Sequence, residues 1–199
     1  MEKKNIWLIR PTEVNGIKFV NELLKNYNCN LLVCNKYFKD NLKSKIDKTI
    51  LNENIIRCKE EITNFSYSKE IYNKDPFLKY LNWAIHNLDA FDDNKDGLSS
   101  SEKFYLTDYY LNFWAEKIYK QKPDVVLFFD IPHCVHDIVL LGLVKTFKIK
   151  SVIIKNKIKY SMLLDANLDP IEHKNSITVE EFCEKYLKET IRSIISQDK

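Results

Sequence analysis

The sequence contains 199 residues, of which 45% are hydrophobic and 30% are charged, and its formal net charge is +3. These proportions are typical of a folded globular domain and exclude an intrinsically disordered chain. The small net charge gives no electrostatic support for nucleic-acid binding, so no nucleic-acid partner is expected.

The cysteines and the N-terminus predict a cytoplasmic protein. Five cysteines are spread along the chain without a C-x-x-C pair, which is typical of reduced thiols in a reducing compartment. The N-terminus lacks the apolar core of about 7–15 residues found in signal peptides. No apolar run approaches the roughly 18 residues that a membrane-spanning helix requires, so no membrane span is expected.

Strand and helix patterns alternate over the first part of the chain. Residues 5–10 and 31–34 are short apolar runs, typical of buried strands. Between them, residues 13–27 carry apolar side chains at helical spacing. A weaker third strand is predicted within residues 52–59, around Ile55. Together these elements predict the β-α-β opening of a doubly wound parallel sheet.

Residues 63–98 are less regular and are the best candidate for an insertion beside the sheet. Asp75-Pro76 and the polar stretch 92–97 interrupt an otherwise helical pattern. This polar stretch resembles the first half of an EF-hand calcium loop, but Lys103 occupies position 12, where a bidentate acid is required. A polar turn before the next helix is therefore the favoured interpretation.

A capping box at Ser99 and Glu102 predicts a helix that begins there and ends near residue 120. Its many aromatic residues are interpreted mainly as core residues, with a sugar-stacking or base-stacking face as the alternative. Apolar runs at residues 125–129 and 152–154 predict two more buried strands, and a buried helix at residues 138–147 joins them.

A second capping-box pattern opens an amphipathic helix that is predicted over residues 178–196. The patterns together predict an α/β fold, with residues 1–199 forming a single Rossmann-like domain. In this fold a three-layer parallel sheet is flanked by helices. The helical insertion, residues 63–98, lies between the third and fourth strands.

Candidate site residues follow the ends of two predicted strands. In open parallel sheets, ligands bind outside the carboxyl ends of the strands, where loops and helix N-termini converge. Asp130 and His133 form a candidate catalytic pair, because an imidazole titrates near neutral pH and a carboxylate can orient it. The candidate substrate-binding residues are Arg10, Thr12, Glu13, His136 and Asp137.

Several of these residues also have structural interpretations. Asp137 can stabilise the start of the following helix, Arg10 can form a surface salt bridge, and His133 can be solvated without a role. A metal site formed by His133, His136, Cys134 and Asp137 is a more specific alternative. Its H-x-x-H-D spacing does not match a ligand helix such as H-E-x-x-H, so we predict no metal ligand.

The glycine content argues against several enzyme classes. Only three glycines occur, and the chain contains no Gly-x-Gly-x-x-Gly, Walker or Gly-x-Ser-x-Gly motif. A dinucleotide dehydrogenase, a P-loop NTPase and an α/β-hydrolase are therefore disfavoured. No resident cofactor is expected.

The central part of the chain resembles a known family. The matching parts are residues 98–102, the aromatic helix that ends in Phe113 and Trp114, residues 122–133 and residues 149–154. They resemble the N-terminal half of bacterial capsule and surface-polysaccharide biosynthesis proteins. Those proteins are similar to glycosyltransferases of the two-Rossmann-domain (GT-B) type.

The resemblance implies an acceptor-side domain that binds a glycan and supplies a general base for sugar transfer. By this resemblance, His133 or Asp130 would deprotonate the acceptor hydroxyl, and a nucleotide-sugar would be the co-substrate. Such enzymes bind the donor nucleotide in a second Rossmann domain, for which the residues after Ile154 are too few. A donor-binding domain or a partner chain is therefore expected. The family's glycine after the Pro-His pair is replaced here by Cys134-Val135.

Two other functions are compatible with the sequence. The first is a non-catalytic binding or assembly module of a polysaccharide system, which would use the aromatic helix and the C-terminal amphipathic helix as an interface. The second is a small metal-assisted α/β enzyme with a site at His133, His136 and Asp137.

Overall fold

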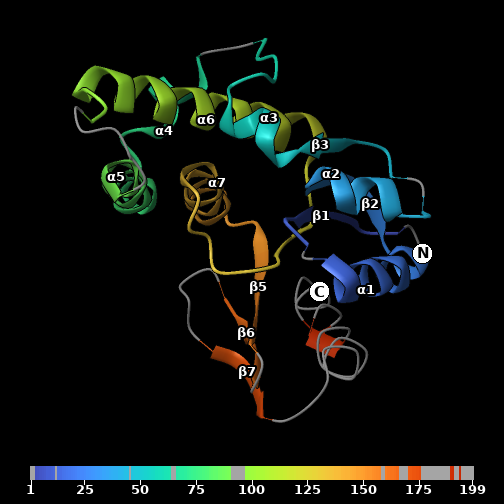
Figure 1. The fold of residues 1–199 in the computed structure, drawn as a ribbon. Helices are drawn as coiled ribbons and strands as arrows, with labels where there is room; N and C mark the ends of the chain where they lie inside the picture. Colours follow the sequence, from blue (N-terminus) through green and yellow to red (C-terminus); the bar gives the residue numbers. More distant parts are fainter. Residues whose placement is uncertain are drawn as a thin grey trace. The chain divides into compact units, whose positions relative to one another are not determined.

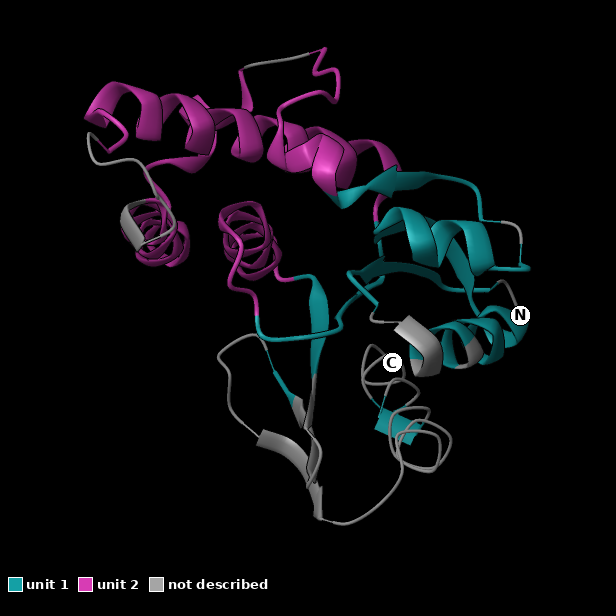
Figure 2. Cartoon of the chain, in the orientation of Figure 1, with its two compact units in different colours: residues 1–52, 123–131, 149–199 teal, residues 53–122, 132–148 magenta. Residues whose placement is uncertain are grey.

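A computed structural model describes most of the chain in two compact units (Figure 2). Unit 1 contains residues 1–52, 123–131 and 149–199, and unit 2 contains residues 53–122 and 132–148. The described residues are 3–11, 13–44, 46–63, 66–90, 97–157, 160–165, 170–175, 189–190 and 193.

Unit 1 is built on a seven-stranded sheet with the strand order β3-β2-β1-β4-β5-β6-β7 (Figure 1). The strands are β1 (Asn5–Ile9), β2 (Asn28–Cys34), β3 (Thr49–Leu51), β4 (Val125–Phe128), β5 (Lys150–Lys157), β6 (Tyr160–Leu164) and β7 (Pro170–Asn175). The first five strands in this order, β3, β2, β1, β4 and β5, are all parallel. This parallel sheet, flanked by helices, confirms the predicted α/β Rossmann-like fold.

Two helices of unit 1, α1 (Glu13–Asn26) and α2 (Lys36–Asn41), contribute to its core. Phe19 and Val20 of α1 and Phe38 of α2 lie in one cluster with Ile6 and Leu8 of β1. The alternate residues of β1 are also buried, as are those of β4. Burial on both faces explains why these strands are continuous apolar runs rather than alternating ones.

The chain reverses its direction of travel across the sheet between β1 and β4. From β1 it proceeds outward to β2 and then to β3, whereas β4 returns to the other side of β1 and is followed by β5. The predicted strand at residues 125–129 is therefore central, with parallel neighbours on both sides. A reversal of this kind is the topological switch point at which open α/β sheets bind their ligands.

The third strand does not lie where the sequence predicts it. Ile55 belongs to the short helix α3 (Asn52–Ile56), and the strand that pairs with β2 is β3, immediately before this helix. Short apolar runs are compatible with a strand or with one buried helical turn, and here the pairing with Leu32 to Cys34 decides between them. The antiparallel strands β6 and β7 extend the sheet beyond β5 and were not predicted.

Unit 2 is helical in its described part. After α3 it contains α4 (Tyr67–Ile71), α5 (Asp75–Ala90), α6 (Ser100–Gln121) and α7 (Val135–Thr146) (Figure 1). Helices α5 and α6 both contact α7, and α4 contacts α6. The predicted helices at residues 99–120 and 138–147 are confirmed. The extent of the insertion at residues 63–98 stays a prediction, because its helices α4 and α5 belong to a larger unit.

Two predicted features fall on residues outside the described part of the chain. They are the calcium-like stretch, of which residues 92–96 are affected, and most of the C-terminal helix at residues 178–196. Among the described residues, no helix combines the length and the hydropathy needed to cross a bilayer.

The predicted capping box is present at the start of α6. The Ser99 side chain accepts a hydrogen bond from the Glu102 N–H, and the Glu102 carboxylate accepts one from the Ser99 N–H at 2.8 Å. Hydrogen bonds from Ser99 also lower the pKa of the Glu102 carboxyl. The first turn of α6 is therefore stabilised by contacts between residues that are close in sequence.

We expect Ser99→Ala to destabilise the protein by about 1 kcal/mol in urea titrations, because the Glu102 N–H loses its side-chain acceptor. Ser100→Ala is the matched control, because this serine is the first helical residue rather than the cap. The free energy of unfolding of this variant should equal or slightly exceed that of the parent protein. Equal losses in the two variants would contradict the capping role.

Candidate functional site

The carboxyl ends of β1 and β4 lie next to each other at the switch point of unit 1. Ile9 is the register partner of Phe128, and the Phe129 N–H donates a hydrogen bond to the Ile9 carbonyl at 2.9 Å. Arg10 and Asp130 follow these residues directly. The structure therefore brings two of the predicted site residues to one edge of the sheet, one cationic and one anionic.

Arg10 turns the chain sharply at the end of β1. Its φ is 56°, in the left-handed region that non-glycine residues rarely adopt, and its N–H donates to the Val33 carbonyl at 2.8 Å. The residue is half-buried. A left-handed arginine costs roughly 1–2 kcal/mol relative to glycine, and such outliers cluster at binding sites.

Asp130 is exposed at the end of β4. One oxygen of its carboxylate accepts the Ile131 N–H at 2.8 Å, which orients the side chain locally. An exposed, oriented carboxylate can bind a cation or accept a proton from a bound hydroxyl group.

The other residues predicted beside Arg10 are less defined. Thr12 lies outside the described residues, and Glu13 begins α1 with a side chain that is also outside them. Sequence reasoning missed Asn35, which follows β2 at the same edge. Its side chain accepts the Phe38 N–H at 2.7 Å and caps α2, so its polar group already has a structural role.

The remaining predicted residues lie at the start of α7, in unit 2. His136 and Asp137 are both buried, each with a relative exposure of 1%. The His136 Nδ1 lies 3.1 Å from the Asp137 Oδ1. Both side chains are enclosed in the interior. Their contact with a substrate stays a prediction.

Two aromatic rings of α6 surround the His136 imidazole. The Trp114 ring is stacked on it, with centroids 6.2 Å apart and an interplanar angle of 29°. The Tyr110 ring lies 5.9 Å away, and its hydroxyl donates to the Ile56 carbonyl at 3.1 Å. The imidazole is thus held in a largely apolar aromatic environment.

Cys134 joins His136 and Asp137 in one group. The ligand atoms of these three side chains all lie within 4.8 Å of one another. Cys134 is half-buried and is the N-cap residue of α7. His133 is exposed and is not part of this group. A metal site that includes His133 stays a prediction.

The predicted catalytic pair spans the boundary between the units. Asp130 belongs to unit 1 and His133 to unit 2. Each residue is exposed in its own segment. The pairing of the two side chains stays a prediction.

Most aromatic side chains of α6 are core residues, as the sequence predicts. Tyr109, Tyr110, Phe113 and Trp114 are buried. Phe104 and Tyr105 near the start of the helix are exposed, at 56% and 69%. Tyr119 near the end of the helix is also exposed, at 40%, but its ring is stacked on that of Tyr67.

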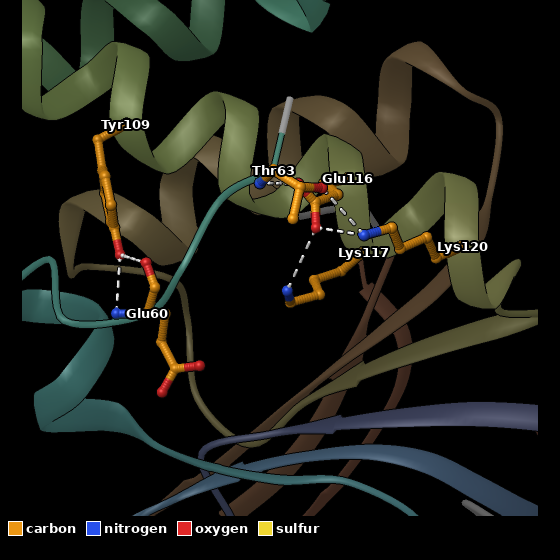
Figure 3. A network of polar contacts seen from close by, with 6 residues as sticks. All are labelled: Glu60, Thr63, Tyr109, Glu116, Lys117 and Lys120. Atoms are coloured by element: carbon orange, nitrogen blue, oxygen red, sulfur yellow. Dashed lines mark hydrogen bonds and ion pairs between the residues drawn. The ribbon is translucent and has the colours of Figure 1, made fainter. Parts of the chain in front are cut away.

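Hydrogen bonds and an ion pair connect residues 60–63 and α6 within unit 2 (Figure 3). The Glu116 carboxylate accepts the Thr63 N–H at 2.7 Å and the Lys120 ammonium at 2.6 Å. The Tyr109 hydroxyl donates to the Glu60 carbonyl at 2.7 Å. Burial, with a smaller contribution from the nearby Cys58, raises the pKa of Tyr109 to about 12, so this hydroxyl remains a donor at neutral pH.

Burial raises the pKa of three cysteine thiols, of which Cys29 and Cys34 are buried and Cys58 is half-buried. Burial raises the pKa of Cys29 to about 12 and that of Cys34 to about 11. It also raises the pKa of Cys58, against the effect of a hydrogen bond with Tyr110. Because the thiolate is the reactive form, a raised pKa makes these three thiols weak nucleophiles at neutral pH.

Comparison of the chain with protein-family models, with curated proteins and with solved structures gives no match. Function is therefore inferred from the residues at the switch point and at the start of α7.

Proposed function

We propose that the chain is a domain of a surface-polysaccharide glycosyltransferase, which binds a glycan acceptor and supplies a general base for sugar transfer. The observation that carries the proposal is the pair Arg10 and Asp130 at the switch point between β1 and β4. This is the position at which open α/β sheets bind ligands, and the pair offers one positive and one negative group. The sequence resemblance supplies the reaction class.

In the proposed reaction, the Asp130 carboxylate takes the proton of an acceptor hydroxyl. The oxygen then attacks the anomeric carbon of a nucleotide-sugar, and the bond from that carbon to the phosphate oxygen breaks. The nucleoside diphosphate leaves with the electron pair. A positioned carboxylate acting as the base typically contributes a factor of about 10²–10⁴ to the rate.

Arg10 has a different role in the proposal. Its guanidinium binds an anion, either a phosphate of the donor or a carboxylate of an acidic glycan, because its planar donors match both groups. The resemblance also names His133 as a candidate base. The donor nucleotide is bound by a further domain or a partner chain, and the reaction is cytoplasmic.

The test has two stages. In the first, the full chain is applied to an array of neutral and acidic bacterial surface-polysaccharide oligosaccharides, and a selective interaction with one class is expected. In the second, the best-bound oligosaccharide is mixed with nucleotide-sugars and the donor-binding partner, and released nucleoside diphosphate is measured. Failure to bind any oligosaccharide above an unrelated protein would overturn the acceptor role.

The variants separate chemistry from binding. Asp130→Asn should reduce transfer by about a hundredfold or more while glycan binding persists. Asp40→Asn, which changes an exposed carboxylate on α2, should leave both unchanged. Arg10→Gly keeps the left-handed turn and removes the guanidinium, so it should weaken binding. A loss of transfer in His133→Ala but not in Asp130→Asn would move the base to His133.

A second candidate, a non-catalytic binding module, is favoured by the exposed Phe104 and Tyr105 of α6. Exposed aromatic rings at adjacent positions are typical of contact surfaces for sugars or proteins. This function predicts that Phe104→Ala together with Tyr105→Ala abolishes glycan binding while Asp130→Asn has no effect. The glycosyltransferase proposal predicts instead that the double aromatic variant still binds glycan and that Asp130→Asn loses sugar transfer.

A further inference from the structure

We propose that Cys134, His136 and Asp137 form a binding site for a divalent cation of the zinc class at the start of α7. This inference is independent of the proposed glycosyltransferase function. It rests on the convergence of a thiol, an imidazole and a carboxylate, whose ligand atoms all lie within 4.8 Å of one another.

The spacing of the donors is close to that of a zinc site. Zinc–sulfur bonds are about 2.3 Å and zinc–nitrogen or zinc–oxygen bonds about 2.0 Å, so tetrahedral donors lie roughly 3.3–3.5 Å apart. The His136 Nδ1 and the Asp137 Oδ1 are 3.1 Å apart. Cys134 is half-buried and has one side-chain rotation with which to bring its sulfur into place.

The charges in this group favour a bound cation. The Asp137 carboxylate is buried, and enclosing a carboxylate is costly unless positive charge compensates it. A divalent ion would compensate the carboxylate and a Cys134 thiolate together.

The donor set selects the kind of metal. Thiolate and imidazole ligands favour zinc and related borderline ions, whereas magnesium and calcium require oxygen ligands. Three protein ligands leave one coordination position for water or a bound substrate group.

The surroundings fit a structured metal site. Trp114 is stacked on the imidazole and Tyr110 lies beside it, so the ring cannot rotate freely. The Tyr110 hydroxyl is itself anchored to the Ile56 carbonyl. Such a shell fixes the orientation of a ligand and keeps water away, which strengthens the interaction with a cation.

The experiment uses the full chain, purified with a non-thiol reductant and stripped of metal with a chelator. Cobalt(II) is titrated in, and absorption reports the thiolate-to-cobalt band and the intense visible bands of tetrahedral cobalt. We expect one equivalent per chain, and displacement of the cobalt by zinc. No saturable binding at one equivalent would overturn the proposal.

Ligand variants identify the site. Cys134→Ser should abolish the thiolate band and weaken zinc binding by more than about tenfold, and Asp137→Asn should weaken it comparably. Cys58→Ser is the matched control, because Cys58 lies in the same unit outside the group. Cys134→Ser changes one half-buried atom, so circular dichroism should remain unchanged. A thiolate band that persists in Cys134→Ser, or disappears in Cys58→Ser, would overturn the assignment.

Discussion

Replacing Glu116 with alanine is expected to lower the free energy of unfolding by about 3 kcal/mol, the lower end of the range for breaking a buried ion pair. The carboxylate is 2% exposed and accepts hydrogen bonds from the N–H and the hydroxyl of Thr63, at 2.7 and 3.0 Å. Without it, the Thr63 N–H loses its acceptor, and residues 60–63 lose an attachment to α6 (Figure 3).

The two lysines of the network contribute unequally to this loss. The Lys117 side chain is 8% exposed and its ammonium lies 3.9 Å from the carboxylate, so it would remain enclosed without that charge. Its position 5.0 Å from the Phe113 ring centre offers partial compensation. The Lys120 side chain is 56% exposed, and solvent screening makes its loss a minor part of the effect.

Urea titration measures the change in stability, and hydrogen exchange at the Thr63 amide tests its cause. In Glu116→Ala this amide should lose its protection. Glu116→Gln, which retains an acceptor oxygen and the side-chain volume, should fall between the parent and the alanine variant. Glu61→Ala, an exposed carboxylate in the same segment, should change stability by less than about 0.5 kcal/mol. A loss below 1 kcal/mol in Glu116→Ala, or a protected Thr63 amide, would contradict the structural role.

Gly142→Val should destabilise the protein by roughly 3 kcal/mol, because helices α5 and α7 approach too closely for a side chain at this position. A Cβ atom at residue 142 would lie 2.7 Å from the Tyr80 Cβ and 3.1 Å from the Phe77 ring. The Tyr80 Cβ is fixed to its own backbone, so the contact is relieved only if the helices move apart. Valine adds two further methyl groups to the same contact.

Alanine substitutions at two helical glycines provide the matched comparison. Gly142→Ala gains about 1 kcal/mol of helix propensity but meets the Tyr80 contact, and a net loss of stability is expected. At Gly16 in α1, a Cβ would meet no atom closer than the Phe38 ring edge at 3.1 Å. Gly16→Ala should therefore be close to neutral in urea titrations. Equal stabilities for Gly142→Ala and Gly16→Ala would contradict the close helix approach.

Local signals predicted the elements that local chemistry stabilises. The capping box at Ser99 and Glu102 is a pairing between residues three apart, and it forms in the structure as the spacing predicts. The run at residues 125–129 is apolar throughout because both faces of β4 are buried, and β4 is central in the sheet. Arg10 and Asp130 were predicted at one edge of the sheet because each follows a strand, and neighbouring parallel strands end at the same edge.

The sequence-based predictions were wrong or incomplete where pairing between distant strands competes with local conformational preference. Ile55 was expected in a strand and lies in α3, because the neighbouring residues 49–51 pair with β2 instead. Strands β6 and β7 carry little signal of their own, and their pairing with β5 defines them. Isolated strands of five or six residues are unstable without partners, so their formation depends on the rest of the sheet.

The sequence alone determined the alternation of buried strands and helices, because hydrophobic periodicity and capping are short-range properties of the chain. Tertiary structure alone decided which charged and ligating side chains are buried. Glu116 would be assigned to a solvated helix face, yet residues 60–63 cover it. His133 and His136 are three residues apart, and only the packing of α7 against α6 encloses the second beside Trp114 and leaves the first exposed. Burial depends on contacts between residues distant in sequence, and those contacts set the chemistry that each group can perform.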